Sequence, residues 1–158
     1  MSDSSRSPSR RRFLIATTAV AAVGGSIGRL TGCASGPPPG PNDVGAVSDF
    51  ALDTFRVPTV LPTVIVARDA GGIYAFSSVC THMGCTVPLP VANRSRCPCH
   101  QSEFDGNGDL IRPATGATTQ LPLGHFVVTF TGTGGTARVV VDTSMPQPDR
   151  AARAQPLA

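Results

Sequence analysis

The chain has 158 residues, of which 41% are hydrophobic, 15% are charged and 5% are aromatic, and its formal net charge is +3. The first 32 residues hold five Arg and one Asp, so the remainder carries a net −1 and offers no basic surface for nucleic acid. Gly and Pro make up about a fifth of the chain, which is typical of a loop-rich β domain and not of a helical bundle.

The N-terminal segment has the pattern of an export signal. Three consecutive Arg residues in SRRRFLI (9–15) precede an uncharged apolar run that extends from Phe13 to Gly28. This run is shorter than the roughly 20 residues that a membrane-spanning helix needs. The Arg pair before Phe-Leu resembles a twin-arginine signal, and we expect residues 1–32 to be that signal.

The stretch LTGC at residues 30–33 ends the apolar run. It resembles a lipobox, which implies that Cys33 is lipidated and holds the protein at a membrane surface. The alternative is a free or buried thiol at Cys33. Residues 33–46 are rich in Gly and Pro and predict a flexible tether. The expected location is periplasmic, or the extracytoplasmic face of the cell membrane.

The folded part is expected over residues 47–142, followed by a disordered tail at 143–158. Short apolar runs separated by Gly-rich turns predict two β-hairpins, and no convincing helical period extends over ten residues. The hairpin strands are expected at 63–68, 73–78, 124–130 and 137–142. We predict a small all-β antiparallel sandwich or barrel, with the chemistry in loops 79–90 and 97–122.

Six metal-binding residue types gather in those two loops. Each loop supplies two Cys and one His: Cys80, His82 and Cys85 in the first, and Cys97, Cys99 and His100 in the second. Two thiolates and two imidazoles can hold a single zinc ion, but this leaves one Cys in each loop unexplained. A two-iron cluster with two Cys on one iron and two His on the other fits better, because the spare thiols can pair in an oxidising compartment.

The stretches CTHMGC (80–85) and CPCHQSEF (97–104) resemble the Rieske iron–sulfur motif. The similarity is to the disulfide-bearing form of quinol–cytochrome c reductases and arsenite oxidase small subunits, and it covers about residues 47–142. It implies the Rieske fold, a two-loop cluster-binding subdomain and a [2Fe-2S] cofactor. The implied roles are inner-iron ligands Cys80 and Cys97, outer-iron ligands His82 and His100, a Cys85–Cys99 disulfide, and Ser102 as a hydrogen-bond donor to a bridging sulfide.

The chain departs from the motif at three places. Gln101 stands where the quinol-oxidising members usually have Gly, and Phe104 stands where high-potential members often have a Tyr that donates to the ligand at Cys97. Arg112 begins the segment that is usually Gly-Pro-Ala. Loss of a donor to sulfur lowers a cluster's reduction potential. We therefore predict a potential above that of plant-type ferredoxins but below the top of the Rieske range of about −150 to +300 mV.

The remaining histidine, His125, is predicted to be a surface or packing residue. A Rieske oxygenase catalytic subunit needs a second iron with two more His ligands, so the sequence argues against that class. The resemblance implies an exported one-electron carrier, or the Rieske subunit of a membrane-associated oxidoreductase. Its partners would be a cytochrome or a molybdenum subunit, and possibly quinol. The alternative is a zinc-stabilised β domain that acts as a binding module.

Overall fold

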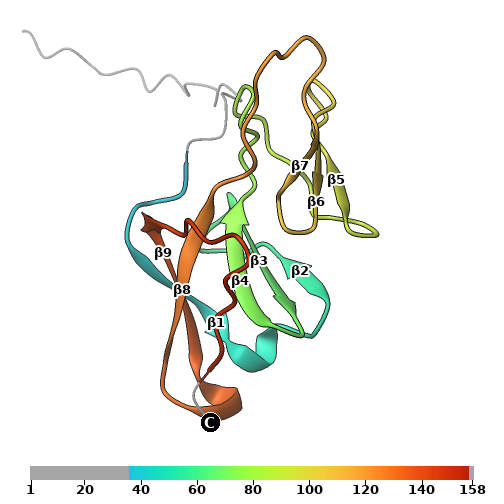
Figure 1. Ribbon diagram of the computed structural model, residues 1–158. Helices are drawn as coiled ribbons and strands as arrows, with labels where there is room; N and C mark the ends of the chain where they lie inside the picture. The colour runs from blue at the N-terminus through green and yellow to red at the C-terminus, as the bar shows by residue number, and fades with distance from the viewer. Residues whose placement is uncertain (1–35, 157–158) are drawn as a thin grey trace, which may run out of the picture. The chain divides into compact units, whose positions relative to one another are not determined.

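The computed structural model describes residues 36–156 (Figure 1). The expected signal at 1–32 and the expected lipidation site Cys33 lie outside these residues. Within 36–156, no helix is long and apolar enough to cross a membrane.

In residues 36–156, nine antiparallel strands form two sheets, so the all-β prediction is confirmed. The large sheet has the order β1-β9-β8-β4-β3-β2, and the small sheet has the order β5-β6-β7. The strands of the large sheet are β1 (Pro41–Ala46), β2 (Thr54–Arg56), β3 (Val64–Asp69), β4 (Gly72–Ser77), β8 (His125–Thr131) and β9 (Arg138–Pro146). Those of the small sheet are β5 (Arg94–Arg96), β6 (Glu103–Asp105) and β7 (Leu110–Arg112), and two short 3-10 helices are η1 (Val47–Asp49) and η2 (Gly134–Thr136).

The β3–β4 hairpin separates two hydrophobic cores. Its strands pair from Val64↔Ser77 to Asp69↔Gly72 and are apolar on both faces. Because successive side chains of a strand point to opposite faces, alternate residues enter different cores. Val64, Val66, Ile73 and Ala75 pack in one core with β1 and β9. Ile65, Ala67, Tyr74 and Phe76 pack in the other, which also contains Cys80, Cys97, Phe104 and Leu123. The second core thus supports the two Cys-bearing loops.

The ordered region is longer than the sequence led us to expect. Strand β1 begins at Pro41, inside the expected tether, and pairs with β9 over its whole length. Strand β9 continues to Pro146, and residues 147–156 form a C-terminal arm in place of the expected disordered tail. The Pro- and Arg-rich composition hides this order, because the arm is held by backbone pairing and not by apolar periodicity. Ile73 and Ala154 exchange backbone hydrogen bonds of 2.9 and 2.8 Å.

Arg153 fastens the arm to the rest of the fold. Its Nε donates to Asp69 Oδ2 at 2.7 Å, and its guanidinium lies 3.6 Å from the centre of the Tyr74 ring. Its Nη2 also donates to Asn107 Oδ1 at 3.0 Å. Burial would raise the pKa of Asp69, but the hydrogen bonds from Arg153 and the Gly71 N–H outweigh it and hold that pKa below its usual value. The arm therefore connects the large sheet to the turn after β6.

We expect Arg153→Ala to lower the free energy of unfolding by about 2 kcal/mol, because it removes a charge-assisted hydrogen bond and a cation–π contact. Denaturant unfolding followed by circular dichroism measures the change. The matched control is Arg138→Ala, which breaks a 2.9 Å ion pair with Asp43 between side chains that are about half exposed. Exposed pairs contribute about 0–1 kcal/mol. Equal losses in the two variants would show that the contacts of Arg153 stabilise the fold no more than an exposed ion pair does.

Candidate metal centre

The first Cys-bearing loop follows β4 and is closed by its own backbone. The Cys80 N–H donates to Cys85 O at 2.8 Å, and the Gly84 N–H donates to Cys80 O at 2.9 Å. Gly84 has φ = 75°, a left-handed conformation that glycine adopts without steric cost. This conformation turns the chain sharply between His82 and Cys85.

The second loop, between β5 and β6, repeats the same arrangement. The Cys97 N–H donates to Ser102 O at 2.8 Å, and the Gln101 N–H donates to Cys97 O at 3.1 Å. Gln101 has φ = 65° and so takes the same left-handed turn as Gly84 in the first loop. This explains why the Rieske motif usually has Gly there: a side chain in this conformation costs about 1–2 kcal/mol. The Gln101 side-chain amide donates to Pro98 O at 3.2 Å.

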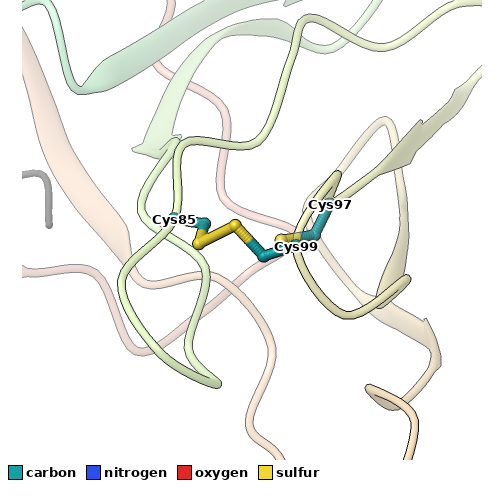
Figure 2. A group of neighbouring side chains, drawn as sticks. All are labelled: Cys85, Cys97 and Cys99. Atoms are coloured by element: carbon teal, nitrogen blue, oxygen red, sulfur yellow. A yellow bond between two sulfur atoms is a disulfide. The ribbon is translucent and has the colours of Figure 1, made fainter. Parts of the chain in front are cut away.

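A disulfide joins the two loops, as the resemblance implies. Cys85 and Cys99 are bonded, with their Cα atoms 6.5 Å apart (Figure 2). The Cys97 Sγ lies near them, and the three sulfur atoms are within 4.8 Å of one another. This trio is not itself a metal site, because bonded disulfide sulfurs offer no thiolate. The disulfide instead holds the loop that contains Cys97 against the loop that contains Cys80.

The four remaining residues form an asymmetric donor set. Cys80 and Cys97 are free thiols only 3% and 1% exposed, whereas His82 and His100 are partly exposed. The two imidazole rings meet edge to face, with centroids 4.7 Å apart. Burial raises the pKa of the Cys97 thiol, and the adjacent Cys80 thiol raises it further. Nearby positive charge is what such a pair of thiols needs in order to ionise.

His82 provides an independent test of whether a metal fits here. Its Nδ1 atom is buried and has no hydrogen-bond partner. An unsatisfied buried polar atom costs about 1–3 kcal/mol, so a native protein normally supplies a partner. A coordinated metal is such a partner. Two buried thiols and two partly exposed imidazoles fit a [2Fe-2S] cluster with sulfur donors on one iron and nitrogen donors on the other.

A third segment, between β7 and β8, covers the site. The Thr115 N–H donates to His100 O at 2.9 Å, and the Thr81 hydroxyl donates to Leu121 O at 2.5 Å. Ser102 is fully buried, and its Oγ lies 3.7 Å from Cys80 Sγ. Sequence reasoning missed Gln120, whose side chain reaches both Ser102 and Cys80. No local motif marks this glutamine, because its contacts are 18 and 40 residues away along the chain.

His125, the first residue of β8, has a different set of contacts. It is buried, and its ring stacks on Phe76 with centroids 5.7 Å apart. Its Nε2 lies 2.7 Å from Asn107 O. Burial lowers the pKa of this imidazole and so favours its neutral form. Of the two alternatives predicted for His125, the packing role is therefore the one found.

The comparisons with known proteins agree with this geometry. The model of the Rieske [2Fe-2S] domain family matches residues 41–131, and the chain belongs to this family. The cytochrome b6-f complex iron-sulfur subunit of Prochlorococcus marinus (strain MIT 9215) is 40% identical over 67 residues, which cover 40% of this chain and 36% of that subunit. The same subunit from Synechococcus elongatus is 41% identical over 73 residues, which cover 46% of this chain and 38% of that subunit.

Matches among solved structures include a Rieske protein and a ferredoxin. The plasma membrane Rieske protein PetC3 from Synechocystis PCC 6803 is 26% identical, with a TM-score of 0.42, and the match covers 65% of this chain and 99% of that one. The ferredoxin of carbazole 1,9a-dioxygenase from Nocardioides aromaticivorans IC177 is 22% identical, with a TM-score of 0.44, and the match covers 66% and 99%.

The chain is thus a Rieske iron–sulfur electron-transfer protein whose cofactor is a [2Fe-2S] cluster. The zinc-binding alternative is set aside, because the family domain holds iron and sulfide. When bound, the cluster supplies one-electron redox chemistry. The match spans under two fifths of the length of the curated relatives.

Proposed function

We propose that this protein is an exported one-electron carrier, acting alone or as the Rieske subunit of a membrane-associated oxidoreductase. Its electrons would enter and leave through the edge of the cluster held by His82 and His100. The observation that carries this proposal is the asymmetry of the four donors: the thiols are buried and the imidazoles reach the surface. An exposed ligand edge shortens the distance to a partner, while the buried sulfur side anchors the cluster.

The ligand assignment is part of the proposal. Cys80 and Cys97 bind the inner iron, and His82 and His100 bind the outer iron. Ser102 donates its hydroxyl hydrogen to a cluster sulfur. The close approach of the two thiols, the paired imidazoles and the unpartnered Nδ1 of His82 support this assignment.

Export is supported by two separate features. The disulfide between Cys85 and Cys99 is suited to an oxidising compartment outside the cytoplasm. The N-terminal sequence resembles a twin-arginine signal followed by a lipobox at Cys33. A lipid on Cys33 would keep the cluster domain at the membrane surface, where a redox complex is within reach.

The surface beside the imidazoles suits a redox partner protein. Met83 is 60% exposed and directly follows His82, and Leu121, in the covering segment, is 74% exposed. Large exposed apolar side chains beside a functional group favour transient contact with another surface. The partner would be a cytochrome or a molybdenum subunit, or a quinol held by a membrane subunit.

A potentiometric titration of the purified full chain tests the proposal. We expect one reversible one-electron transition between about −150 and +300 mV, the range of Rieske centres. The change is followed by the visible absorbance of the cluster. A transition near the roughly −400 mV of plant-type ferredoxins, or no redox-active chromophore at all, would contradict the proposed carrier.

A further inference from the structure

The segment between β7 and β8 places the side chain of Gln120 against a sulfur ligand. Its Nε2 lies 3.7 Å from Cys80 Sγ, 3.0 Å from Ser102 Oγ and 3.2 Å from Thr81 Oγ1. In this network Cys80 and Ser102 are buried, and Gln120 is partly buried. Gln120 therefore closes one side of the cluster site with a polar group.

The orientation of the Gln120 amide follows from its other neighbour. The Ala114 backbone N–H lies 2.7 Å from Gln120 Oε1. A backbone N–H can only donate, so the atom facing it must be the carbonyl oxygen. The NH₂ group then points toward Cys80 Sγ. Ser102 Oγ lies within hydrogen-bonding distance of both ends of the amide, 3.0 Å from Nε2 and 3.2 Å from Oε1. Gln120 is thus a donor to the sulfur side of the site, and its direction is fixed by the covering segment itself.

Phe104 makes this donor important. Its ring is fully buried in the core that contains Cys80 and Cys97, and it has no hydroxyl group to offer to sulfur. Ser102 and Gln120 each place a polar side-chain group 3.7 Å from Cys80 Sγ. The covering segment thus adds a donor that the phenylalanine cannot provide.

We propose that Gln120 tunes the reduction potential of the cluster by donating a hydrogen bond to Cys80 Sγ. This inference rests on the proposed role of Cys80 as an iron ligand. Reduction adds one electron to the cluster and increases the negative charge on its sulfurs. Hydrogen bonds to charged acceptors are stronger than those to neutral ones, so the donor stabilises the reduced state and raises the potential.

Gln120→Leu removes the donor, and redox titration of the full chain measures the effect. At the midpoint potential of the wild type, we expect the ratio of reduced to oxidised protein to fall about tenfold, which corresponds to a midpoint lowered by 59 mV for a one-electron couple. The matched control is Gln101→Leu. It removes an amide beside His100 that donates to Pro98 O and not to sulfur. We expect it to change the ratio less than about twofold.

A second variant, Gln120→Glu, keeps the length of the side chain and an oxygen for the Ala114 N–H, but replaces the NH₂ donor by a carboxylate. Gln120→Glu should lower the reduction potential at least as far as Gln120→Leu. If the leucine variant loses its cluster, the potential of the glutamate variant tests the inference in its place. A potential equal to or above that of the wild type in Gln120→Glu, or equal shifts in Gln120→Leu and Gln101→Leu, would overturn the inference. Failure of the wild type itself to titrate as a Rieske centre would instead count against the proposed function.

Discussion

The variant Cys97→Ser is expected to lose the cluster. Cys97 is almost fully buried beside Cys80, and its backbone is fixed by hydrogen bonds at both ends of its loop. A serine hydroxyl at this position ionises far less readily than a thiol and binds iron weakly. Partners outside the ligand shell alone can change metal affinity by roughly 10–100-fold, so loss of a ligand should lower the affinity for the cluster by at least that factor and leave the purified protein depleted of iron. Iron analysis of the purified protein measures it.

Cys33→Ser is the matched control for this variant. It makes the same atomic change at the one cysteine outside the two loops. We expect it to keep the full iron content and the visible spectrum, whatever it does to membrane attachment. If Cys97→Ser retained its iron, or if Cys33→Ser lost it, the proposed ligand set would be wrong.

The double variant Cys85→Ser/Cys99→Ser is expected to be markedly less stable. The disulfide joins residues 14 apart in sequence, and closing a loop of about 15 residues contributes about 3 kcal/mol in the chain-entropy estimate. For a domain of this size, such a loss lowers the midpoint of thermal unfolding by roughly 10 °C. Differential scanning calorimetry of the cluster-loaded protein measures the shift. Changing both cysteines avoids leaving one reactive thiol near Cys97.

The same variant should also release its cluster faster than the wild type, because the two ligand loops then lack a covalent link. The decay of visible absorbance at constant temperature reports this release. Wild-type protein treated with a thiol reductant is the control, since it removes the same bond without any substitution. An unchanged unfolding midpoint together with an unchanged rate of cluster loss would contradict a clamping role for the disulfide.

The β-hairpins could be predicted from the sequence because their signals are local. The turn DAGG sits between two apolar runs, and β3 and β4 pair across it from Val64↔Ser77 to Asp69↔Gly72. Strand β1 gives no such signal: its sequence PNDVGA has a single large apolar residue, Val44, and its pairing with β9 spans almost the whole domain. The C-terminal arm is hidden for the same reason, since Arg153 and Ala154 act through partners more than 80 residues away.

The candidate site divides along the same line. The six Cys and His residues lie in two short stretches whose spacing is itself the signal, so they could be recognised without knowledge of the fold. The sequence alone does not predict the left-handed turn at Gln101 or the contact of Gln120 with Cys80. The first depends on the backbone conformation of a loop, and the second on where the covering segment returns across the site. The residues Thr, Gln and Leu at 119–121 form no motif that would indicate a contact with the site.

The central claim is that one [2Fe-2S] unit is held by Cys80 and Cys97 on its buried side and by His82 and His100 on its exposed side. Electron paramagnetic resonance of the reduced full chain, with iron and sulfide analysis of the same sample, tests it most directly. We expect two iron and two sulfide per chain and an average g value below that of clusters with four cysteine ligands, as the mixed donor set of a Rieske centre requires. A colourless protein with one zinc ion per chain, or a spectrum typical of all-cysteine ligation, would contradict the account.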